Sequence, residues 1–337
     1  MLNTFPFSLR TRLYCFPAAI LIGVLFVALT SAQNSSTGKG TPTPTPTPPP
    51  TITDRDEAPL KVQTDLVTLT LTVHDDWGRY VSGLTKKHFS VFENGVEQEM
   101  SFFSDADAPA SIGIVYDISG SMGSGKILRS RQALERFMLT SHPSDEYSLI
   151  TFNDKVRLLA DRTRDNNEVL DKLSLFKPGG NTAFYDGVYL GVDRVMRGSH
   201  AKRALLVISD GQDNSSRYSF REMRRLLKEA DVIIYAIGIS DGGGGLDDAG
   251  QGFLKQLSEA TGGRAFFPGG DGSFDEICER IALELRHQYS IGYVPTDFRL
   301  DGKWRSLKVK IAPPRGMPRL SVRARKGYYA TPVSPVK

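Results

Sequence analysis

Two hydroxyl groups and a carboxylate follow one another closely in this chain. Asp117, Ser119 and Ser121 form a D-x-S-x-S sequence directly after the apolar run 110–116. An apolar run of this length, ended by turn residues, is typical of a buried strand, so the three polar side chains leave a strand end together. Hard oxygen donors suit Mg²⁺, which takes few protein ligands and keeps water or another carboxylate in its remaining positions. The stretch therefore indicates a divalent-metal site.

Two further polar residues extend this candidate set. Thr182 lies in the Gly- and Asn-containing segment 179–183, and Asp210 follows the apolar run that ends at Ser209. In open α/β sheets, ligands bind beyond the carboxyl ends of the strands, where the strand order reverses. Because Asp117 and Asp210 both stand just past expected strand ends, we expect them at such a point.

The order D-x-S-x-S, then Thr, then Asp resembles the metal-ion-dependent adhesion site (MIDAS) of von Willebrand factor A domains. The resemblance implies that Ser119 and Ser121 coordinate the ion through their hydroxyls. Thr182 would coordinate directly or through water, whereas Asp117 and Asp210 would act mainly through bound waters. Neutral ligands leave an ion electrophilic, so the resemblance implies a binding protein, not an enzyme. The expected ion is Mg²⁺, with Mn²⁺ or Ca²⁺ possible, and the expected partner is a protein presenting an acidic residue.

Other functions fit parts of the same sequence. Residues 120–126 match G-x-x-x-x-G-K, the phosphate-binding loop, but Ile127 stands where Ser or Thr should hold Mg²⁺. A G-x-S-x-G hydrolase would need Gly at position 119, which is Ser. A metal-dependent phosphohydrolase or nuclease would need a general base or a second metal, with Asp186 and Asp213 as the nearby candidates. Asp213 also fits a turn-capping role, and a purely structural domain with a stabilising ion is a further alternative.

The N-terminus has the layout of an export signal over residues 1–32. Arg10 and Arg12 precede the apolar run 16–29, and a Thr-Ser-Ala exit follows. The run is shorter than the roughly 20 residues that a spanning helix prefers. Cleavage is the first interpretation, and a retained inner-membrane anchor at residues 16–32 stays open. We expect a periplasmic, cell-surface or secreted protein.

Charge, cysteine and histidine content narrow the function further. The formal net charge is +4, two of it from the leader, and no basic patch carries interleaved aromatics, so no nucleic-acid partner is expected. Without the leader, Cys278 is the one remaining cysteine, and it falls on an apolar helical stripe. We expect a buried thiol, no internal disulfide and a monomer. The five histidines stand singly, without metal-ligand spacing, and are expected on the surface or in loops.

The pattern along the chain divides it into segments. Residues 33–58 are rich in Ser, Thr, Gly and Pro and predict an extended linker. Residues 59–107 alternate apolar and polar positions and carry an Asn-Gly hairpin signal. Residues 108–287, to which the resemblance extends, predict a doubly wound, mostly parallel α/β sheet covered on both faces. Residues 288–337 return to strands, which we expect to join the N-terminal strands in one small β module around the inserted α/β domain.

The whole chain resembles bacterial exported proteins related to von Willebrand factor A, in which a leader and a Pro/Thr spacer precede a β segment. That segment ends in a phrase like Val-Phe-Glu-Asn-Gly, here residues 91–95. Within the α/β region the expected strands are 112–116, 147–152, 204–209, 232–239 and 264–267, and the expected helices are 127–140, 167–175, 185–196, 220–230, 253–260 and 274–286.

Overall fold

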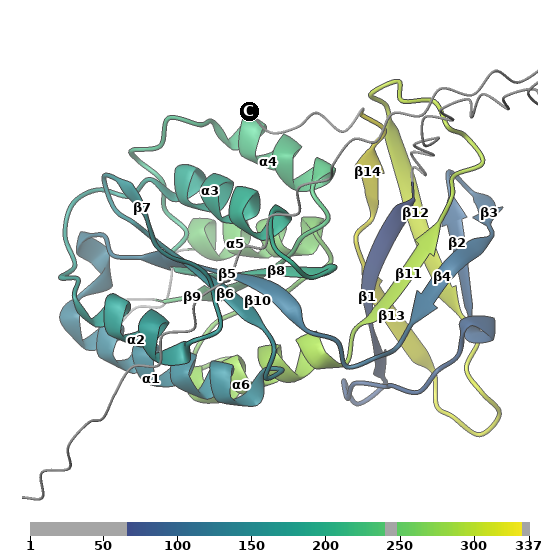
Figure 1. The fold of residues 1–337 in the computed structure, drawn as a ribbon, viewed down its shortest axis with the longest axis horizontal. Coiled ribbons are helices and arrows are strands. Elements are labelled where there is room, and N and C mark those ends of the chain that lie inside the picture. The colour runs from purple at the N-terminus through teal and green to yellow at the C-terminus, as the bar shows by residue number, and fades with distance from the viewer. Residues whose placement is uncertain (1–65, 240–247, 332–337) are drawn as a thin grey trace, which may run out of the picture. The chain divides into compact units, whose positions relative to one another are not determined.

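The central part of the chain forms a six-stranded sheet with helices on both faces (Figure 1). The structure is a computed structural model that describes residues 66–239 and 248–331, apart from the side chains of residues 124–127. These residues all belong to one compact unit, residues 61–337. The expected leader and linker lie outside the described residues. No helix in the described ranges is long and apolar enough to cross a membrane.

The strand order of this sheet is β10-β9-β8-β5-β6-β7. Neighbouring strands run parallel except β6 and β7, which are antiparallel. The expected mostly parallel α/β sheet is therefore confirmed. The strands are β5 (Ala110–Asp117), β6 (Glu146–Phe152), β7 (Val156–Thr163), β8 (Lys202–Ser209), β9 (Ile233–Gly238) and β10 (Ala265–Phe266).

Strand β7 was not among the expected strands. It lies at the edge of the sheet, and most of its side chains are half-buried or exposed, so it lacks the continuous apolar run of a central parallel strand. Charged residues such as Arg157 and Asp161 interrupt its apolar positions. The sequence pattern of an edge strand is weaker for this reason.

Successive residues of the central strands point to opposite faces, and each face is covered by three helices. Ile114 and Tyr116 pack in the cluster formed with α1, α2 and α6, whereas Val115 and Val207 pack in the cluster formed with α3, α4 and α5. Cys278, on α6, is buried and unpaired, as expected. The helices are α1 (Ser124–Thr140), α2 (Asn166–Ser174), α3 (Phe184–Met196), α4 (Phe220–Glu229), α5 (Asp248–Ala260) and α6 (Phe274–Arg286).

Strands from both sides of this α/β region pair with one another. One antiparallel sheet has the order β13-β1-β11-β4 and the other β14-β12-β2-β3, so each mixes N- and C-terminal strands. The expected joining of the flanking strands is confirmed. We call these eight strands the β module: β1 (Val67–Asp75), β2 (Phe89–Glu93), β3 (Val96–Gln98), β4 (Met100–Ser104), β11 (Tyr289–Tyr293), β12 (Trp304–Ile311), β13 (Leu320–Ala324) and β14 (Gly327–Tyr329).

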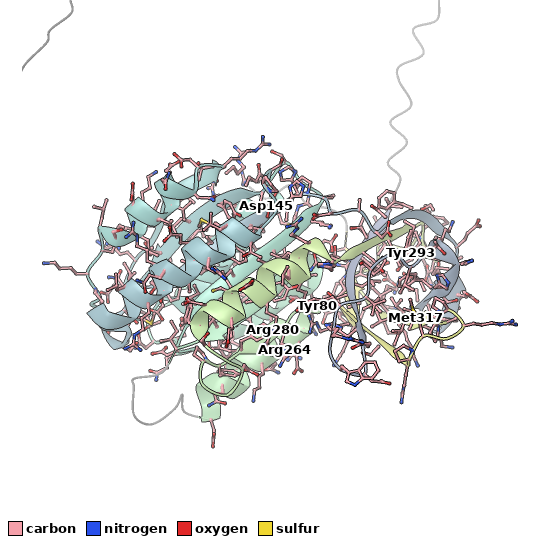
Figure 2. The ribbon with its side chains drawn as sticks, turned by 90° about the horizontal axis from the view of Figure 1, so that it is seen from below. Tyr80, Asp145, Arg264, Arg280, Tyr293 and Met317 are labelled. Carbon is pink, nitrogen blue, oxygen red and sulfur yellow. The ribbon has the colours of Figure 1, made fainter. Side chains whose placement is uncertain are left out.

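The two sheets of the β module share one hydrophobic core. Leu71 and Tyr293 from the first sheet are fully buried in the same cluster as Val91 and Leu307 from the second (Figure 2). Alternating apolar positions on these strands supply the inner faces of the two sheets. Neither the N-terminal nor the C-terminal strands alone would enclose this core.

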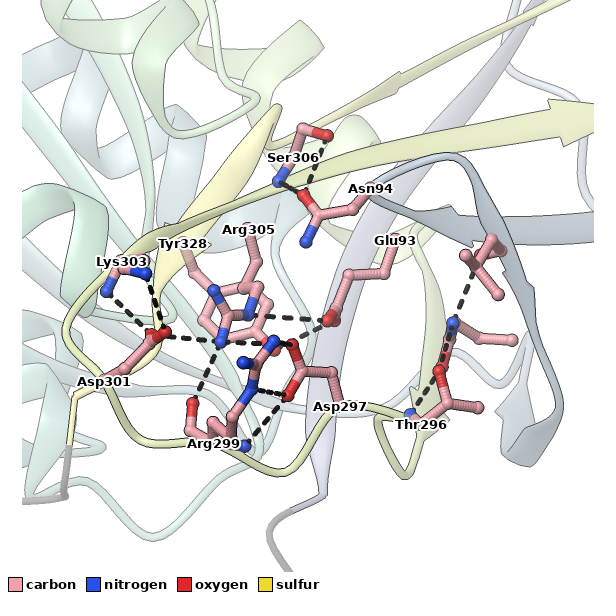
Figure 3. Close-up of polar contacts among 12 residues, drawn as sticks. Glu93, Asn94, Thr296, Asp297, Arg299, Asp301, Lys303, Arg305, Ser306 and Tyr328 are labelled. Atoms are coloured by element: carbon pink, nitrogen blue, oxygen red, sulfur yellow. Dashed lines mark hydrogen bonds and ion pairs between the residues drawn. The ribbon is translucent and has the colours of Figure 1, made fainter.

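The hairpin between β2 and β3 is fixed to the rest of the β module by polar contacts (Figure 3). Asn94 and Gly95 have φ angles of 48° and 84°, the left-handed region that a two-residue hairpin turn of this type requires. The Ser306 amide donates a hydrogen bond to Asn94 Oδ1 at 2.9 Å. Beneath the turn, the buried Glu93 accepts hydrogen bonds from the Tyr293 hydroxyl at 2.6 Å and the Tyr328 hydroxyl at 2.9 Å. The Asn-Gly hairpin is confirmed.

Candidate metal centre

The predicted site residues lie where the order of the six-stranded sheet reverses. From β5 the chain adds β6 and β7 on one side, and then β8, β9 and β10 on the other. Asp117 is the last residue of β5, and Asp210 directly follows the neighbouring strand β8. Both residues thus stand at the carboxyl ends of adjacent parallel strands, where ligands bind in sheets of this kind.

Asp117 is fully buried and held by two hydrogen bonds. The Ser119 amide donates to its Oδ1 at 2.8 Å, and the Ser209 hydroxyl donates to its Oδ2 at 2.7 Å. Sequence reasoning gave Ser209 no role, although it directly precedes Asp210 and its side chain therefore comes from the same strand end. The two donors keep the carboxylate in place beside the loop that follows β5.

The two serines of the D-x-S-x-S sequence lie next to each other. Ser119 is buried and precedes the short 3₁₀ helix η2 (Gly120–Met122), and its Oγ lies 3.1 Å from that of Ser121. Met122 is buried in the core and anchors the turn from below. Helix α1 starts after this turn. Lys126, the lysine of the competing phosphate-loop pattern, is among the residues whose side chains are not described.

Hydrogen bonds join the loops that carry the remaining two residues. The Gly120 amide donates to the Gly180 carbonyl at 3.0 Å, which ties the serine loop to the Thr182 loop. The Thr182 amide in turn donates to Asn214 Oδ1 at 2.8 Å, in the segment that follows Asp210. The structure therefore brings together the three loops that hold the five predicted site residues, although they are far apart in the sequence.

A fourth loop packs against these three. The Asn181 amide donates to Asp154 Oδ1 at 3.0 Å, in the turn after β6. Gly180 has a φ of 84°, and a Cβ at this position would lie 2.0 Å from Asp154 Oδ2. The positive φ favours glycine at position 180, and any Cβ there would force the Asp154 side chain away from the Asn181 amide. Asp154 was not predicted as a neighbour of the site, because only the fold places it there.

Both carboxylates of the centre, Asp117 and Asp210, are buried. Burial raises the pKa of Asp117 to about 6, hydrogen bonds from Ser119 and Ser209 oppose this rise, and the Asp210 carboxylate adds to it. Among the described side chains, which do not include those of residues 124–127, no ion pair reaches Asp117 or Asp210. Two neighbouring carboxylates without a compensating cation repel each other.

The donor set fits a hard divalent cation. It consists of three hydroxyls and two carboxylates, all oxygen donors, and the two acidic groups provide the negative charge that Mg²⁺ prefers. In the described part of the chain there is no cluster of three or more His, Cys, Asp or Glu side chains that could hold a metal. The candidate centre has only two such side chains, Asp117 and Asp210, because its other three oxygen donors are Ser and Thr hydroxyls.

The two carboxylates considered as catalytic candidates, Asp186 and Asp213, accept hydrogen bonds from backbone amides. Asp186 accepts hydrogen bonds from the amides of Arg217 at 2.9 Å and Tyr218 at 3.0 Å. Asp213 accepts from the amide of Tyr185 at 3.2 Å, at the start of α3. These contacts match the turn-capping interpretation of Asp213 and give Asp186 a similar structural role.

The family model for the von Willebrand factor type A domain matches residues 111–277. The chain contains a von Willebrand factor A domain. The match runs from β5 to the first part of α6, so it covers all six strands of the sheet and the loops of the candidate centre. The residues predicted as a metal site, Asp117, Ser119, Ser121, Thr182 and Asp210, all lie within the matched range.

The chain is similar to several other proteins at low sequence identity. An uncharacterised protein of Borreliella burgdorferi is 28% identical over 140 residues, which make up 39% of this chain and 41% of that protein. The matched region thus spans about two fifths of that relative. Among solved structures, an aerotolerance-related membrane protein of Bacteroides fragilis is 15% identical with a TM-score of 0.43, over 52% of this chain and 98% of that one.

Two other solved structures are similar to this chain. A von Willebrand factor type A protein from Catenulispora acidiphila is 12% identical with a TM-score of 0.45, over 79% of this chain and 74% of that one. Proximal thread matrix protein 1 from the mussel byssus, with a zinc-occupied MIDAS motif, is 19% identical with a TM-score of 0.44. The similarity covers 56% of this chain and 48% of that one. Identities this low carry no conclusion about ligands or partners.

Proposed function

We propose that the chain is an exported protein-binding module that engages an acidic side chain of a partner protein through a divalent cation, Mg²⁺ in the first place. The observation that carries the proposal is the junction of three loops with oxygen donors at the point where the strand order reverses. Export rests on the N-terminal leader pattern. The residues proposed to hold the ion are Asp117, Ser119, Ser121, Thr182 and Asp210.

The chemistry of these residues favours binding over catalysis. Three of the five proposed ligands are neutral hydroxyls, so a bound ion would keep much of its charge and offer an open position to a carboxylate oxygen. Asp117 is already engaged by Ser119 and Ser209, which leaves it suited to hold water in place beside the ion. Hydrolysis would need a general base near the ion. The two candidates for that role, Asp186 and Asp213, accept hydrogen bonds from backbone amides in the described structure.

A peptide array tests this proposal with the full chain as the probe. Each peptide carries one Asp or Glu, and its twin carries Asn or Gln at the same position. We expect binding to a subset of acidic peptides in Mg²⁺, loss of that binding in EDTA, and no binding to the twins. The Ser119→Ala variant should lose the same signals, because it removes one hydroxyl ligand.

Two results would contradict the proposal. Binding that persists in EDTA would remove the role of the metal, and equal binding to acidic peptides and their amide twins would remove the role of the carboxylate. If calorimetry shows that Mg²⁺ binds while the array stays blank for every acidic peptide, the ion has the structural role described above as an alternative.

A further inference from the structure

A second concave surface lies at the opposite end of the six-stranded sheet from the candidate metal centre. It is a cleft of about 710 Å³, lined by residues of β1, the following turn, α6, β13 and the start of β10. Arg264 directly precedes β10 and therefore lies at the amino end of that strand, whereas Asp117 and Asp210 lie at carboxyl ends. The cleft and the metal centre are separate sites.

A buried carboxylate fixes the inner wall of this cleft. Glu284, on α6, is 1% exposed and accepts hydrogen bonds from the hydroxyls of Tyr235 at 2.7 Å, Tyr80 at 3.1 Å and Thr72 at 3.2 Å. It also pairs with Arg323 on β13. Because four donors already engage this carboxylate, it has little capacity left to attract a cation into the cleft.

Two further arginines face the cleft beside Phe266. The guanidinium carbons of Arg264 and Arg280 lie 4.9 Å and 5.9 Å from the centre of this ring. Both arginines thus make cation–π contacts with Phe266, and Figure 2 labels them. Arg264 pairs with Asp271 at 3.4 Å, and its side chain is about half exposed. Within the described residues, Arg280 forms no ion pair, so its guanidinium is available to a ligand.

Two acidic residues, Asp75 and Asp76, lie at the rim of the cleft, and Asp76 offsets part of this charge. Asp75 is bound by Arg79 Nε at 2.7 Å and by backbone amides of the turn, which neutralises it locally. His74 is half-buried on β1, and its pKa is sensitive to the charges around it. Burial, followed by Arg323 and Arg264, lowers this pKa to about 4, while Asp75 acts in the opposite direction. Along the inner wall, the arginines Arg264, Arg280 and Arg323 outnumber the one carboxylate, Glu284.

We propose that this cleft binds a small polyanion whose phosphate or carboxylate oxygens pair with Arg264, Arg280 and Arg323. Guanidinium groups bind such oxygens through two parallel N–H donors, which Arg264 and Arg280 can offer from two different elements. Arg323 already donates to Glu284 and to the Gly262 carbonyl, so it contributes charge and its remaining N–H donors. The volume is that of a small-molecule site. Tyr80 and the exposed Trp77 add aromatic surface for the rest of the ligand.

Calorimetric titration of the full chain tests the proposal, in low-salt buffer without divalent ions so that the metal centre takes no part. The probes are inorganic pyrophosphate and, separately, citrate. We expect one saturable site for at least one probe, and affinity at least tenfold weaker in Arg280→Gln. Arg264→Gln, at a side chain that is about half exposed, is the second variant and should weaken binding in the same way. Pyrophosphate binding alone would assign a phosphate ligand, and citrate binding alone a carboxylate ligand; both outcomes support the proposal.

The matched control is Arg225→Gln on α4, far from the lining residues. Arg225 is exposed and pairs with Glu229 at 2.9 Å, so the change removes one positive charge and one surface ion pair outside the cleft. Its affinity should equal that of the unchanged protein. The proposal is overturned if neither probe gives a saturable site, or if Arg225→Gln weakens binding as much as Arg280→Gln does.

Discussion

At the scale of single residues, the candidate metal centre depends on side chains that support the predicted ligands. Ser209 donates to the buried Asp117, and Asn214 holds the backbone of Thr182. Groups that orient a metal ligand affect affinity nearly as strongly as the ligand itself. The five predicted ligands could be found from residue types and order, but these supporting residues could not, because serine and asparagine in loops have many other roles.

Ser209→Ala should weaken Mg²⁺ binding about tenfold while the protein stays folded, because Asp117 loses one of its two hydrogen-bond donors but no proposed ligand is removed. Calorimetric titration with Mg²⁺ measures the change. Ser101→Ala is the matched control, since Ser101 on β4 also donates one hydrogen bond, to the Gly292 carbonyl, away from the centre. Equal Mg²⁺ affinity in both variants would rule out the supporting role of Ser209.

Gly180→Ala should destabilise the protein by about 2 kcal/mol or more, because alanine is strained at a φ of 84° and its Cβ would collide with Asp154. Gly316→Ala serves as control: Gly316 has a φ of 86°, and a Cβ there would meet nothing within 4 Å. Urea unfolding of both variants separates the collision from the backbone strain. Equal losses would show that the approach of Asp154 does not constrain position 180.

His74 should make the stability depend on pH between about 6.5 and 4. In the folded protein its pKa is lowered to about 4, chiefly by burial, whereas the unfolded chain binds this proton near 6.5. The unfolded state therefore binds more protons in this range, so the contribution is fully present above pH 6.5 and is lost as the pH falls to 4. The His74→Gln variant should show a smaller fall in denaturation midpoint from pH 7 to pH 5. Identical pH profiles would contradict the assignment.

At the scale of elements, the hairpin of β2 and β3 shows how a short sequence motif connects the N-terminal strands with the C-terminal strands of the β module. Glu93 connects β2 with Tyr293 of β11 and Tyr328 of β14, and lies 3.9 Å from Arg305 of β12. All four side chains are buried or half-buried. The Glu-Asn-Gly sequence thus supplies both the turn and an anchor beneath it.

Glu93→Ala should destabilise the protein by about 3 kcal/mol, because it leaves two tyrosine hydroxyls without their acceptor and takes a carboxylate from the buried Arg305. Glu97→Ala, on the exposed side of β3, removes a similar charge without such contacts and should change stability by less than about 0.5 kcal/mol. Denaturant unfolding provides the comparison. A loss for Glu93→Ala as small as that of the control would show that the buried network does not stabilise the β module.

Most elements could be predicted because burial on both faces leaves a strong pattern. The central strands are continuous apolar runs, and helices such as α4 and α6 begin with a Ser that caps the helix and a Glu three residues into it. Strand β7 could not be found, since its edge position allows charged residues. The start of α5 at Asp248 also lies before the expected helix, because its first turns contain few apolar residues.

At the scale of the whole molecule, the von Willebrand factor A domain is an insertion within the β module. The sequence indicated that the flanking strands belong together, but not which strands pair, because alternation defines the faces of a strand and not its neighbours. In the structure β1 lies between β11 and β13, and β2 between β3 and β12. The chain enters and leaves the α/β domain through β4 and β11, which pair with each other.

The most direct test of the central claim is a thermal melt and calorimetric titration of the full chain with Mg²⁺ and Mn²⁺, beside the Asp117→Ala variant. A ligand that binds only the folded state raises the melting temperature by mass action. We predict saturable binding and a metal-dependent rise of several degrees for the unchanged protein, and neither for Asp117→Ala, which should still unfold cooperatively. Absence of any metal effect in both proteins, or an equal effect in both, would contradict a metal centre at Asp117.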